Sequence, residues 1–550
     1  MTTLRQRFGQ GLWRLADLVQ ADDRSRSFRA KACRGAVWSL DELSPELEDP
    51  VEHMLSIPGI GSGVVRLIDE FRATGRIAQL DQLADRYPAE VADLRRLPRM
   101  TPAILRSMKA ELGIETEGDL IAAIESGAVE TLRGVGLVTA EKWAQVLDLR
   151  PAQSAIPSFR AAVYAEGLSR HLERHLGGRV WVAGAVRRVE EWVATIDLVA
   201  EVGDVAAART FVEESALGFP TGSSQPDRVQ LMLHAGVTVG VHLATAADLG
   251  LRLLVATGPP EHVDAVMGGT SGPQATEEAV YAARDMVWVP PPARGLPVEE
   301  AIAVVRASEI RGDLHLHSDW SPDGRMSLAQ VLEEAVTRGY EYVLITDHTS
   351  GLRFGGLDEE ALARQRESLH ELRRVFPDLI VLHGAELNIG RDGELDIDDE
   401  ALAVLDLAVA GLHSYFDLGR EDQTRRVLRA LEHPKVKVLA HPTGRRIGTR
   451  PAIELDMRAV IESAAAHGVA LEVNGHRDRL DLSAGDVALA GSAGALLAAN
   501  SDGHRVGEMG NIANSVATIQ KAGVGPGSVV NTRPASEFLE WAGNGRRVTH

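Results

Sequence analysis

Apolar residues along the chain follow several different patterns, which divide it into regions of different secondary structure. Up to about residue 150 they recur at helical spacing, as in LWRLADLV and VVRLIDEF, and predict short helices. From about 155 to 290 short apolar runs such as ATIDLVAEV and VTVGVHLA alternate with helical segments and predict a mixed sheet. Four prolines in WVPPPARGLPVEE then interrupt both patterns, so this stretch is predicted to be a linker or a wrapping arm.

After the linker, apolar runs alternate regularly with amphipathic helices. This alternation predicts a parallel sheet or barrel with right-handed crossovers. The seven candidate strands are GDLHLH, EYVLITDH, LIVLHGAE, LAVAGLH, VKVLAH, VALEVNG and LLAANSDGH.

Length and composition narrow the picture. A chain of 550 residues is too long for one hydrophobic core, so two to four domains are expected. It has no apolar stretch of the roughly 20 residues that a membrane span needs, and its start lacks a signal-peptide core, so we expect a cytoplasmic protein with no membrane partner. One cysteine, Cys33, excludes an internal disulfide framework. The net charge of -20 argues against non-specific coating of nucleic acid, although local basic patches could override it.

Two glycine pairs in the helical region mark candidate phosphate contacts. LSIPGIGSGVVRLI contains Gly59 and Gly61, and LRGVGLVTAEKWAQVL contains Gly134 and Gly136. Glycines between two helices let backbone N–H groups approach a phosphate at a helix N-terminus, so both segments are predicted to be DNA-binding helix-hairpin-helix elements. A third, related segment, LRRLPRMTPAILRSM, has lost its glycines. The alternative is that Gly-X-Gly only makes a tight turn.

Six of the seven candidate strands end in residues that can bind a metal. They are His315 with His317, His348, Glu386, His413, His441, and Asp502 with His504; Asp323, in the turn after the first strand, makes nine. The carboxyl ends of parallel strands meet at one face, so these side chains are expected to form one cluster. One histidine at a strand end is more often a hydrogen-bonded loop residue, but repeated buried ionisable groups are costly without a partner.

Nine candidate ligands exceed the needs of one ion and predict two or three divalent cations. Carboxylates combined with imidazoles suit manganese, zinc or iron, and clustered divalent ions favour phosphoester hydrolysis. Arg445, Arg446 and Arg479 lie just beyond strand ends and are candidate phosphate contacts, the alternative being solvated arginines. Asp347 is interpreted either as the residue that orients His348 or as the cap of the following helix.

The motifs DLHLHSDWSPDG, ITDHT, GAELNI, GLHSYF, AHPTGR, EVNGHRDRLDL and NSDGH resemble those of the polymerase and histidinol phosphatase (PHP) family over about the last 240 residues. This resemblance implies that the same nine residues hold a trinuclear metal site. Together with ADDRSRSFRAKACRGAVWSL near the start, nearly the whole chain resembles a bacterial family X DNA polymerase with a fused PHP domain.

The resemblance implies a multidomain fold with five regions. They are an all-α N-terminal domain with a helix-hairpin-helix (1–90), a helical fingers-like domain with a second one (91–152), a nucleotidyltransferase-like α+β palm and thumb (153–288), a linker (289–308) and an α/β PHP domain built as a distorted (β/α)7 barrel (309–550).

The polymerase site departs from the family pattern of Gly-Ser, Asp-X-Asp and a third Asp. Ala185 stands where the pattern has serine, and Thr195 and Gly240 stand where it has two of the three aspartates, which leaves Asp197 alone. Two-metal phosphoryl transfer needs more than one carboxylate, so we predict no templated nucleotide addition. Glu190 and Glu191 are expected to face solvent rather than to substitute.

The favoured hypothesis is a metal-dependent phosphoesterase acting on gapped, single-stranded or damaged DNA, with the 3'-5' exonuclease or abasic-site activity that the resemblance implies, and a monomer is favoured. One alternative is a phosphatase acting on a small phosphate ester, because fold and metals do not determine the substrate. A DNA-binding scaffold without catalysis and a family X polymerase still active in repair are further alternatives.

Overall fold

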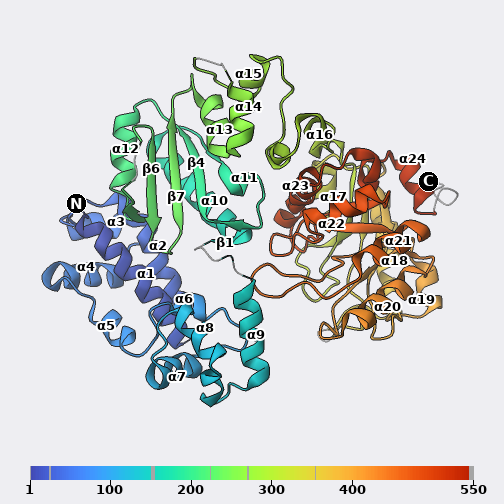
Figure 1. Cartoon of the computed structure of the whole chain (residues 1–550), viewed down its shortest axis with the longest axis horizontal. Coiled ribbons are helices and arrows are strands. Elements are labelled where there is room, and N and C mark those ends of the chain that lie inside the picture. The colour runs from blue at the N-terminus through green and yellow to red at the C-terminus, as the bar shows by residue number, and fades with distance from the viewer. Residues whose placement is uncertain are drawn as a thin grey trace. The chain divides into compact units, whose positions relative to one another are not determined.

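The computed structural model describes residues 2–23, 27–149, 151, 155–222, 225–268, 272–352 and 355–543. They form two compact units, Met1–Met286 and Val287–His550 (Figure 1). Among the described residues, none of the helices combines the length and the apolar character that crossing a bilayer requires.

The first part of the N-terminal unit is helical, as its apolar spacing predicts. α1 begins at a capping box in which Thr3 accepts a hydrogen bond from the Gln6 N–H, and it packs along α2. The Trp143 indole of α9 is fully buried and donates to the Pro98 carbonyl over 2.8 Å. The helices are α1 (Leu4–Asp22), α2 (Ser27–Ser39), α3 (Val51–Ser56), α4 (Ser62–Thr74), α5 (Ala78–Ala84), α6 (Val91–Leu94), α7 (Pro102–Leu112), α8 (Glu117–Glu125) and α9 (Leu137–Asp148).

The second part of this unit contains a five-stranded mixed sheet in the order β2-β4-β7-β6-β5. Its central pair, β4 and β7, is parallel, while β6 runs antiparallel to β7. The strands are β1 (Ile156–Pro157), β2 (Val180–Val182), β3 (Trp192–Val193), β4 (Thr195–Glu201), β5 (Gly218–Pro220), β6 (Arg228–Leu233) and β7 (Thr238–Ala244). The helices are α10 (Ser158–Leu176), α11 (Gly184–Arg187), α12 (Val205–Glu213), α13 (Leu249–Thr257), α14 (Pro260–Met267) and α15 (Glu277–Ala282).

The C-terminal unit alternates parallel strands with helices that pack against them. Its strands are β8 (Gly312–Leu316), β9 (Tyr342–Ile345), β10 (Ile380–His383), β11 (Glu386–Asn388), β12 (Ala408–Gly411), β13 (Val436–Leu439), β14 (Ala470–Asn474) and β15 (Leu497–Asn500). Its helices are α16 (Val298–Ile302), α17 (Leu328–Thr337), α18 (Glu359–Arg373), α19 (Asp399–Val404), α20 (Arg420–Leu431), α21 (Met457–His467), α22 (Ala484–Ser492), α23 (Ile512–Lys521) and α24 (Ala535–Trp541). All five residues of β8 are buried, as expected of a strand covered on both faces.

The strands of this unit form two parallel sheets, β10-β9-β8 and β11-β12-β13-β14-β15. Isolated parallel bridges between Leu316 and Gly503 and between His348 and Glu386 connect the two sheets. The described residues of this unit form eight strands rather than the seven predicted, because the run LIVLHGAELN divides into β10 and β11. Gly384 lies at the division, where a Cβ atom would come within 2.8 Å of the Leu407 carbonyl oxygen.

The proline-rich segment 289–308 packs within the C-terminal unit. It contains a short 3-10 helix, η4 (Pro291–Gly295), which contacts α23, followed by α16. The side chain of Arg294 is buried there and donates to the Val289 carbonyl.

Candidate metal centre

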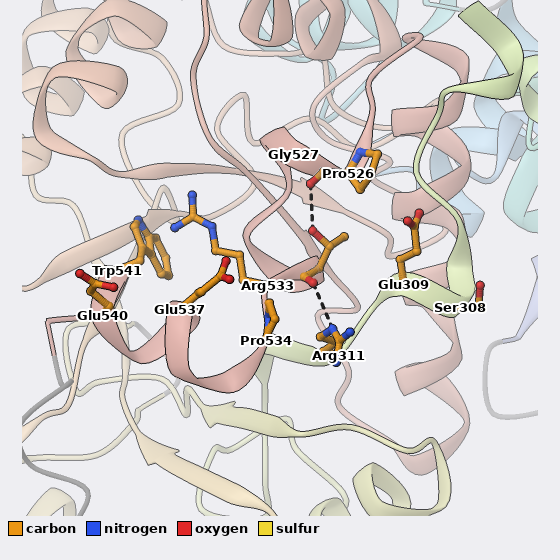
Figure 2. Close-up of a pocket in the computed structure, with 11 residues that line it drawn as sticks. Ser308, Glu309, Arg311, Pro526, Gly527, Arg533, Pro534, Glu537, Glu540 and Trp541 are labelled. Carbon is orange, nitrogen blue, oxygen red and sulfur yellow. Dashed lines mark hydrogen bonds between the residues drawn. The ribbon is translucent and has the colours of Figure 1, made fainter.

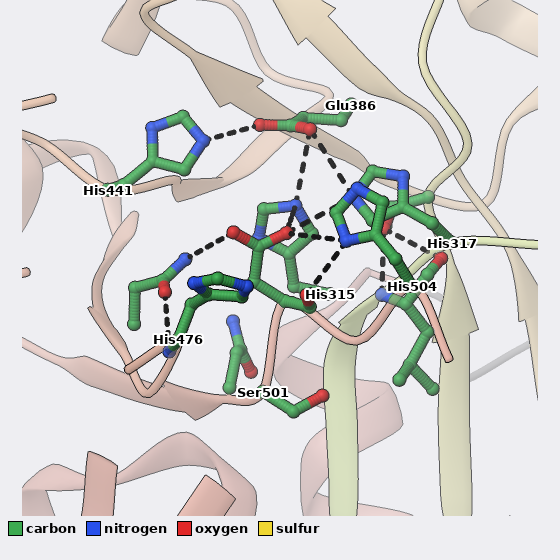
Figure 3. Close-up of polar contacts among 12 residues, drawn as sticks. His315, His317, Glu386, His441, His476, Ser501 and His504 are labelled. Carbon is green, nitrogen blue, oxygen red and sulfur yellow. Dashed lines mark hydrogen bonds and ion pairs between the residues drawn. The ribbon is translucent and has the colours of Figure 1, made fainter. Parts of the chain in front are cut away.

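The nine predicted metal ligands meet at the carboxyl ends of the strands of the C-terminal unit. Figure 3 shows five of them, His315, His317, Glu386, His441 and His504. Eight of them form four overlapping groups whose ligand atoms lie within 4.8 Å of one another. The groups are His317, His348 and His504; His315, Glu386 and His441; His315, His317 and Asp502; and His348, Glu386 and His413. The ninth, Asp323, lies 3.3 Å from His504 Nε2 and 3.5 Å from His348 Nε2.

Glu386, at the start of β11, lies at the centre of the cluster. Both of its carboxylate oxygens face imidazoles, and the residue is only 1% exposed. Oε1 is 2.8 Å from His441 Nε2 and 3.0 Å from His413 Nε2. Oε2 is 3.0 Å from His348 Nδ1, 3.3 Å from His315 Nε2 and 3.5 Å from His317 Nε2. One carboxylate is therefore placed to bridge neighbouring cations.

Asp502, which follows β15, is the second carboxylate shared by several imidazoles. Its Oδ1 lies 3.6 Å from His315 Nε2 and 3.4 Å from His317 Nε2. The residue adopts a left-handed backbone conformation with φ 53°, which aspartate tolerates better than bulky side chains do.

The charges of the cluster suit divalent cations. Burial raises the pKa of Glu386, but the neighbouring His413, His315 and His348 hold it well below the usual range, so the carboxylate is ionised. Burial lowers the pKa of His441 to about 4 and keeps this imidazole neutral. Burial also lowers the pKa of His348, yet Glu386 and Asp323 outweigh it and raise this pKa to about 10.

Several ligand atoms of the cluster lack a hydrogen bond. The Nε2 atoms of His315, His317 and His413 are buried and have no well-aligned hydrogen-bond partner within the described part of the chain. Buried polar atoms are normally satisfied, so orphaned imidazole nitrogens beside ionised carboxylates fit a metal-binding donor set.

Glu472, in the middle of β14, accepts hydrogen bonds from two residues of the cluster, His315 and His441. This role was not predicted from the sequence. Its carboxylate is fully buried and accepts from His315 Nδ1 at 2.7 Å and from the His441 backbone N–H at 2.6 Å. The amides of Asn474 and Asn500 donate to it at 3.0 and 2.9 Å. A proton held on Nδ1 leaves Nε2 of His315 as the ligand atom. The available signal was an acidic residue within the otherwise apolar run VALEV.

Asp347 has neither of the two roles considered for it. It accepts hydrogen bonds from the Ser318 N–H at 2.6 Å, the Ser318 hydroxyl at 2.5 Å and the Gln365 side chain at 2.6 Å. The following helix, α18, is capped by Asp358 instead. Through these hydrogen bonds Asp347 connects the loop after β8 to α18.

The three arginines predicted as phosphate contacts differ in their surroundings. Arg479 is 8% exposed, with its Nε 3.4 Å from Asp502 Oδ2 and its buried Nη1 without a hydrogen-bond partner among the described residues. Arg445 donates to the carbonyl oxygens of Arg479, at 3.1 Å from Nε, and of Leu480. Arg446 pairs with Asp478 at 3.3 Å. The arginine that lies against a metal-capable residue is thus Arg479, while Arg445 braces its backbone.

The two glycine hairpins of the N-terminal unit have the same backbone geometry. Gly59 and Gly134 have φ values of 93° and 90°, and Gly61 and Gly136 are the N-caps of α4 and α9 without a capping side chain. A positive φ is readily adopted only by glycine.

The third segment keeps this turn despite the loss of its glycines. Arg99 takes the left-handed conformation with φ 60°, in the place that corresponds to Gly59. Thr101 caps α7 by accepting from the Ile104 N–H at 3.2 Å, and Pro102 at the first helical position has no N–H. The first of the two amides that are open in the other hairpins is therefore missing here, because its position is occupied by Pro102.

Asp197, on β4, occupies the remaining acidic position of the polymerase-like site. Its Oδ1 lies 3.2 Å from His242 Nε2 and 3.5 Å from Arg228 Nη2. A Cβ atom at Gly240 would lie 2.7 Å from that oxygen and 3.1 Å from Arg228 Nη2. A cationic side chain thus fills the space beside Gly240. Glu190, considered as a substitute, pairs with Arg188 at 3.2 Å.

A pocket of about 890 Å³ lies at the opposite ends of the strands (Figure 2). Arg311, which immediately precedes β8, lines it and donates to the Thr532 carbonyl at 3.1 Å. Arg533, Glu537 and Trp541 lie along another wall. Because the metal-capable side chains follow the carboxyl ends of the strands, this pocket is separate from the cluster.

Comparison with known proteins gives similar chains for both units. No protein-family model matches the chain. The DNA polymerase/3'-5' exonuclease PolX of Bacillus subtilis (strain 168) is 29% identical over 538 residues, covering 92% of this chain and 94% of that protein. A probable phosphatase of Syntrophotalea carbinolica is 29% identical over 247 residues, covering 42% of this chain and 95% of the phosphatase. Probable phosphatase YcdX of Shigella dysenteriae serotype 1 is 27% identical over 246 residues, with 42% and 94% covered.

These similarities confirm the resemblance inferred from the motifs. The similarity to PolX extends over nearly the whole length of both chains, and the phosphatases match the C-terminal part.

Proposed function

We propose that the chain is a metal-dependent phosphoesterase that hydrolyses phosphodiester bonds of DNA, as a 3'-5' exonuclease or a 3'-end or abasic-site processing enzyme. The observation that carries this proposal is the convergence of nine metal-capable side chains, among which Glu386 and Asp502 are each shared by several imidazoles. The similarity of nearly the full chain to a protein named as a 3'-5' exonuclease supports DNA as the substrate.

In this proposal the two parallel sheets form the distorted barrel of PHP proteins, and the nine side chains hold two or three divalent ions, manganese or zinc being preferred. Such ions supply an activated water and stabilise charge on the phosphate. The protein's own contribution is positioning: Glu472 fixes the tautomer of His315, and Glu386 presents one oxygen to each side of the cluster. Arg479 is placed to donate from its buried Nη1 to a phosphate oxygen.

The N-terminal unit is proposed to hold the DNA backbone through its two open hairpins. In α4 the first intrahelical bonds are donated by Val64 and Val65, so the N–H groups of Ser62 and Gly63 are left for a phosphate. In α9 Thr139 and Ala140 donate the corresponding bonds, so the N–H groups of Leu137 and Val138 are left for a phosphate. These N–H groups lie at the positive ends of the helix dipoles, where anions bind.

The polymerase-like region is proposed to be inactive in nucleotide addition. Its single aspartate is engaged by His242 and Arg228, and the position of a third carboxylate is taken up by the Arg228 side chain. A cation beside Asp197 disfavours a divalent metal there, because like charges repel.

A cleavage assay tests the proposal. Metal-depleted protein is supplied with Mn²⁺ and incubated with labelled single-stranded, gapped and abasic-site DNA and, in parallel, with small phosphate esters. We expect metal-dependent DNA cleavage that His315→Ala abolishes and that His370→Ala, an exposed histidine on α18, leaves intact. DNA cleavage that survives in His315→Ala would refute the assignment. Nucleotide incorporation on the gapped DNA would refute the proposed loss of polymerase activity.

A phosphatase acting on a small ester is the second candidate, because the C-terminal unit is similar to probable phosphatases over 94% to 95% of their lengths. In the same assay this function predicts release of inorganic phosphate from small esters with intact DNA. The variants Ser62→Asp and Leu137→Asp separate the two functions, since only DNA cleavage depends on the hairpins.

A further inference from the structure

Tyr415 is an exposed aromatic residue in the loop that carries His413, one of the metal-capable residues. It lies in the loop after β12, two residues beyond His413, and is 44% exposed. Within the described part of the C-terminal unit, it is the aromatic residue that falls in the exposed class. Its backbone is left-handed, with φ 56°.

This conformation is unfavourable for tyrosine. A residue with a Cβ and a bulky ring rarely adopts a positive φ, whereas glycine and asparagine do so readily. Left-handed backbone at other residues is strained and persists where the surroundings impose it, often at functional sites. Folding alone would favour a different residue at position 415.

A buried cation holds the loop in this conformation. Arg426, on α20, is fully buried and donates from Nη2 to the Ser414 carbonyl at 2.9 Å, with its guanidinium 5.9 Å from the Tyr415 ring centroid. Its Nε and Nη1 have no hydrogen-bond partner among the described residues. Gln423, from the same helix, donates to the Tyr415 carbonyl at 2.7 Å. Burying a guanidinium is costly because it must be desolvated. The contacts that Arg426 makes with the Ser414 carbonyl and the Tyr415 ring therefore indicate that it positions this part of the loop.

The residues on either side of Tyr415 are anchored as well. The Ser414 hydroxyl lies 3.4 Å from the side-chain nitrogen of Asn388, on β11. The Phe416 ring lies 4.0 Å from the guanidinium of Arg450, in the loop after β13. Both neighbours are half-buried, whereas Tyr415 between them is exposed.

We propose that Tyr415 is a stacking platform for the base of the nucleotide next to the scissile phosphate, and so determines preference for nucleic-acid ends over phosphates that carry no base. This inference rests on the proposed phosphodiesterase function. A rigid aromatic ring beside a phosphate-binding centre suits any base, because every base has a π face, and such stacking contributes enough to change binding roughly 5- to 100-fold.

The test compares two oligonucleotides that differ only in whether the 3'-terminal sugar carries a base. The native protein is expected to cleave the base-bearing end with a kcat/KM at least about fivefold higher than that for the baseless end. The difference should arise from a lower KM for the base-bearing end. Tyr415→Phe should keep this preference. Tyr415→Asn should abolish it while the thermal midpoint stays equal or rises, since asparagine accommodates the left-handed backbone. Val506→Ala, another exposed apolar residue after a strand of this unit, is the control and should keep the preference.

A second measurement reports on stacking without relying on turnover. A 2-aminopurine base at the 3' terminus, protected by a phosphorothioate linkage, should lose fluorescence on binding the native protein and Tyr415→Phe, but not Tyr415→Asn. If Tyr415→Asn keeps both the cleavage preference and the quenching, the inference is refuted while the proposed function stands. If no DNA is cleaved by any variant, the proposed function is refuted, and unchanged fluorescence would refute the stacking as well.

Discussion

His315 Nδ1 lies 2.7 Å from a carboxylate oxygen of Glu472, a fully buried residue that also accepts a hydrogen bond from the His441 backbone N–H. We predict that Glu472→Gln weakens binding of Mn²⁺ by about 10- to 100-fold, because the amide no longer fixes the proton on Nδ1. Isothermal titration calorimetry of metal-depleted protein measures this, with the exposed Glu454→Gln as the control. Equal affinity in both variants would show that Glu472 does not orient the ligand.

Arg479 should matter for catalysis more than for metal binding. Arg479→Ala is expected to lower kcat for DNA cleavage by about 100-fold, since one charge-assisted contact to the phosphate is lost. Metal affinity should change far less, because Asp502 is also surrounded by imidazoles. Steady-state kinetics of Arg479→Ala check this prediction, with Arg477→Ala, a substitution of a neighbouring exposed arginine, as the control. A loss confined to metal affinity would assign Arg479 a purely structural role.

The three hairpins should differ in their sensitivity to negative charge. An aspartate at the first helical position suits the helix dipole but repels a phosphate. We therefore expect Ser62→Asp and Leu137→Asp each to weaken binding of duplex DNA and to reduce the salt dependence of binding. Pro102→Asp, at the same position of the closed hairpin, should leave binding unchanged. Fluorescence anisotropy at several salt concentrations measures this, and equal effects of all three substitutions would contradict the assignment.

Asp481 predicts a pH dependence of stability. Burial raises the pKa of Asp481 from 3.8 to about 6, despite the opposing charges of Arg445 and Arg479. Because the folded pKa lies above the unfolded one, the folded state binds more protons between these values, and the stability contributed by this residue falls as the pH rises from about 4 to about 6.

Asp481→Asn removes this titration and keeps an acceptor for the Thr443 N–H. Its thermal midpoint relative to the native protein should therefore increase between pH 4 and pH 7 and level off above. Scanning calorimetry in the presence of a chelator measures the difference. A difference that decreases with pH would show that the ionised carboxylate is the stabilised form.

The spatial clustering of the metal-capable residues was predictable from the sequence because they follow the carboxyl ends of consecutive parallel strands. That topology brings His315 and Asp502 together although 186 residues separate them. Alternation of strands and helices was visible in the apolar pattern, but the division of one run into β10 and β11 was not, because it depends on the close packing of Gly384 against Leu407.

Other features depend on contacts between residues distant in the sequence. Glu472 is one carboxylate in an apolar strand, and only the approach of His315 from β8 reveals its role. The retained turn at Arg99 could not be inferred once its glycine was lost, since arginine does not signal a left-handed conformation. Nothing in the sequence distinguishes Tyr415 from other loop residues. Its contact with the buried Arg426 is visible only in the structure.

The most direct test of the proposed metal centre compares the metal content of the native protein with that of the Glu386→Gln variant. Glu386 contacts imidazoles on both sides of the cluster. Equilibrium dialysis against Mn²⁺ followed by elemental analysis should give two or three ions per native chain, fewer in Glu386→Gln, and a parallel loss of DNA cleavage. If native protein binds one ion or none, or if Glu386→Gln keeps the full complement and full activity, the proposed shared-carboxylate metal centre is wrong.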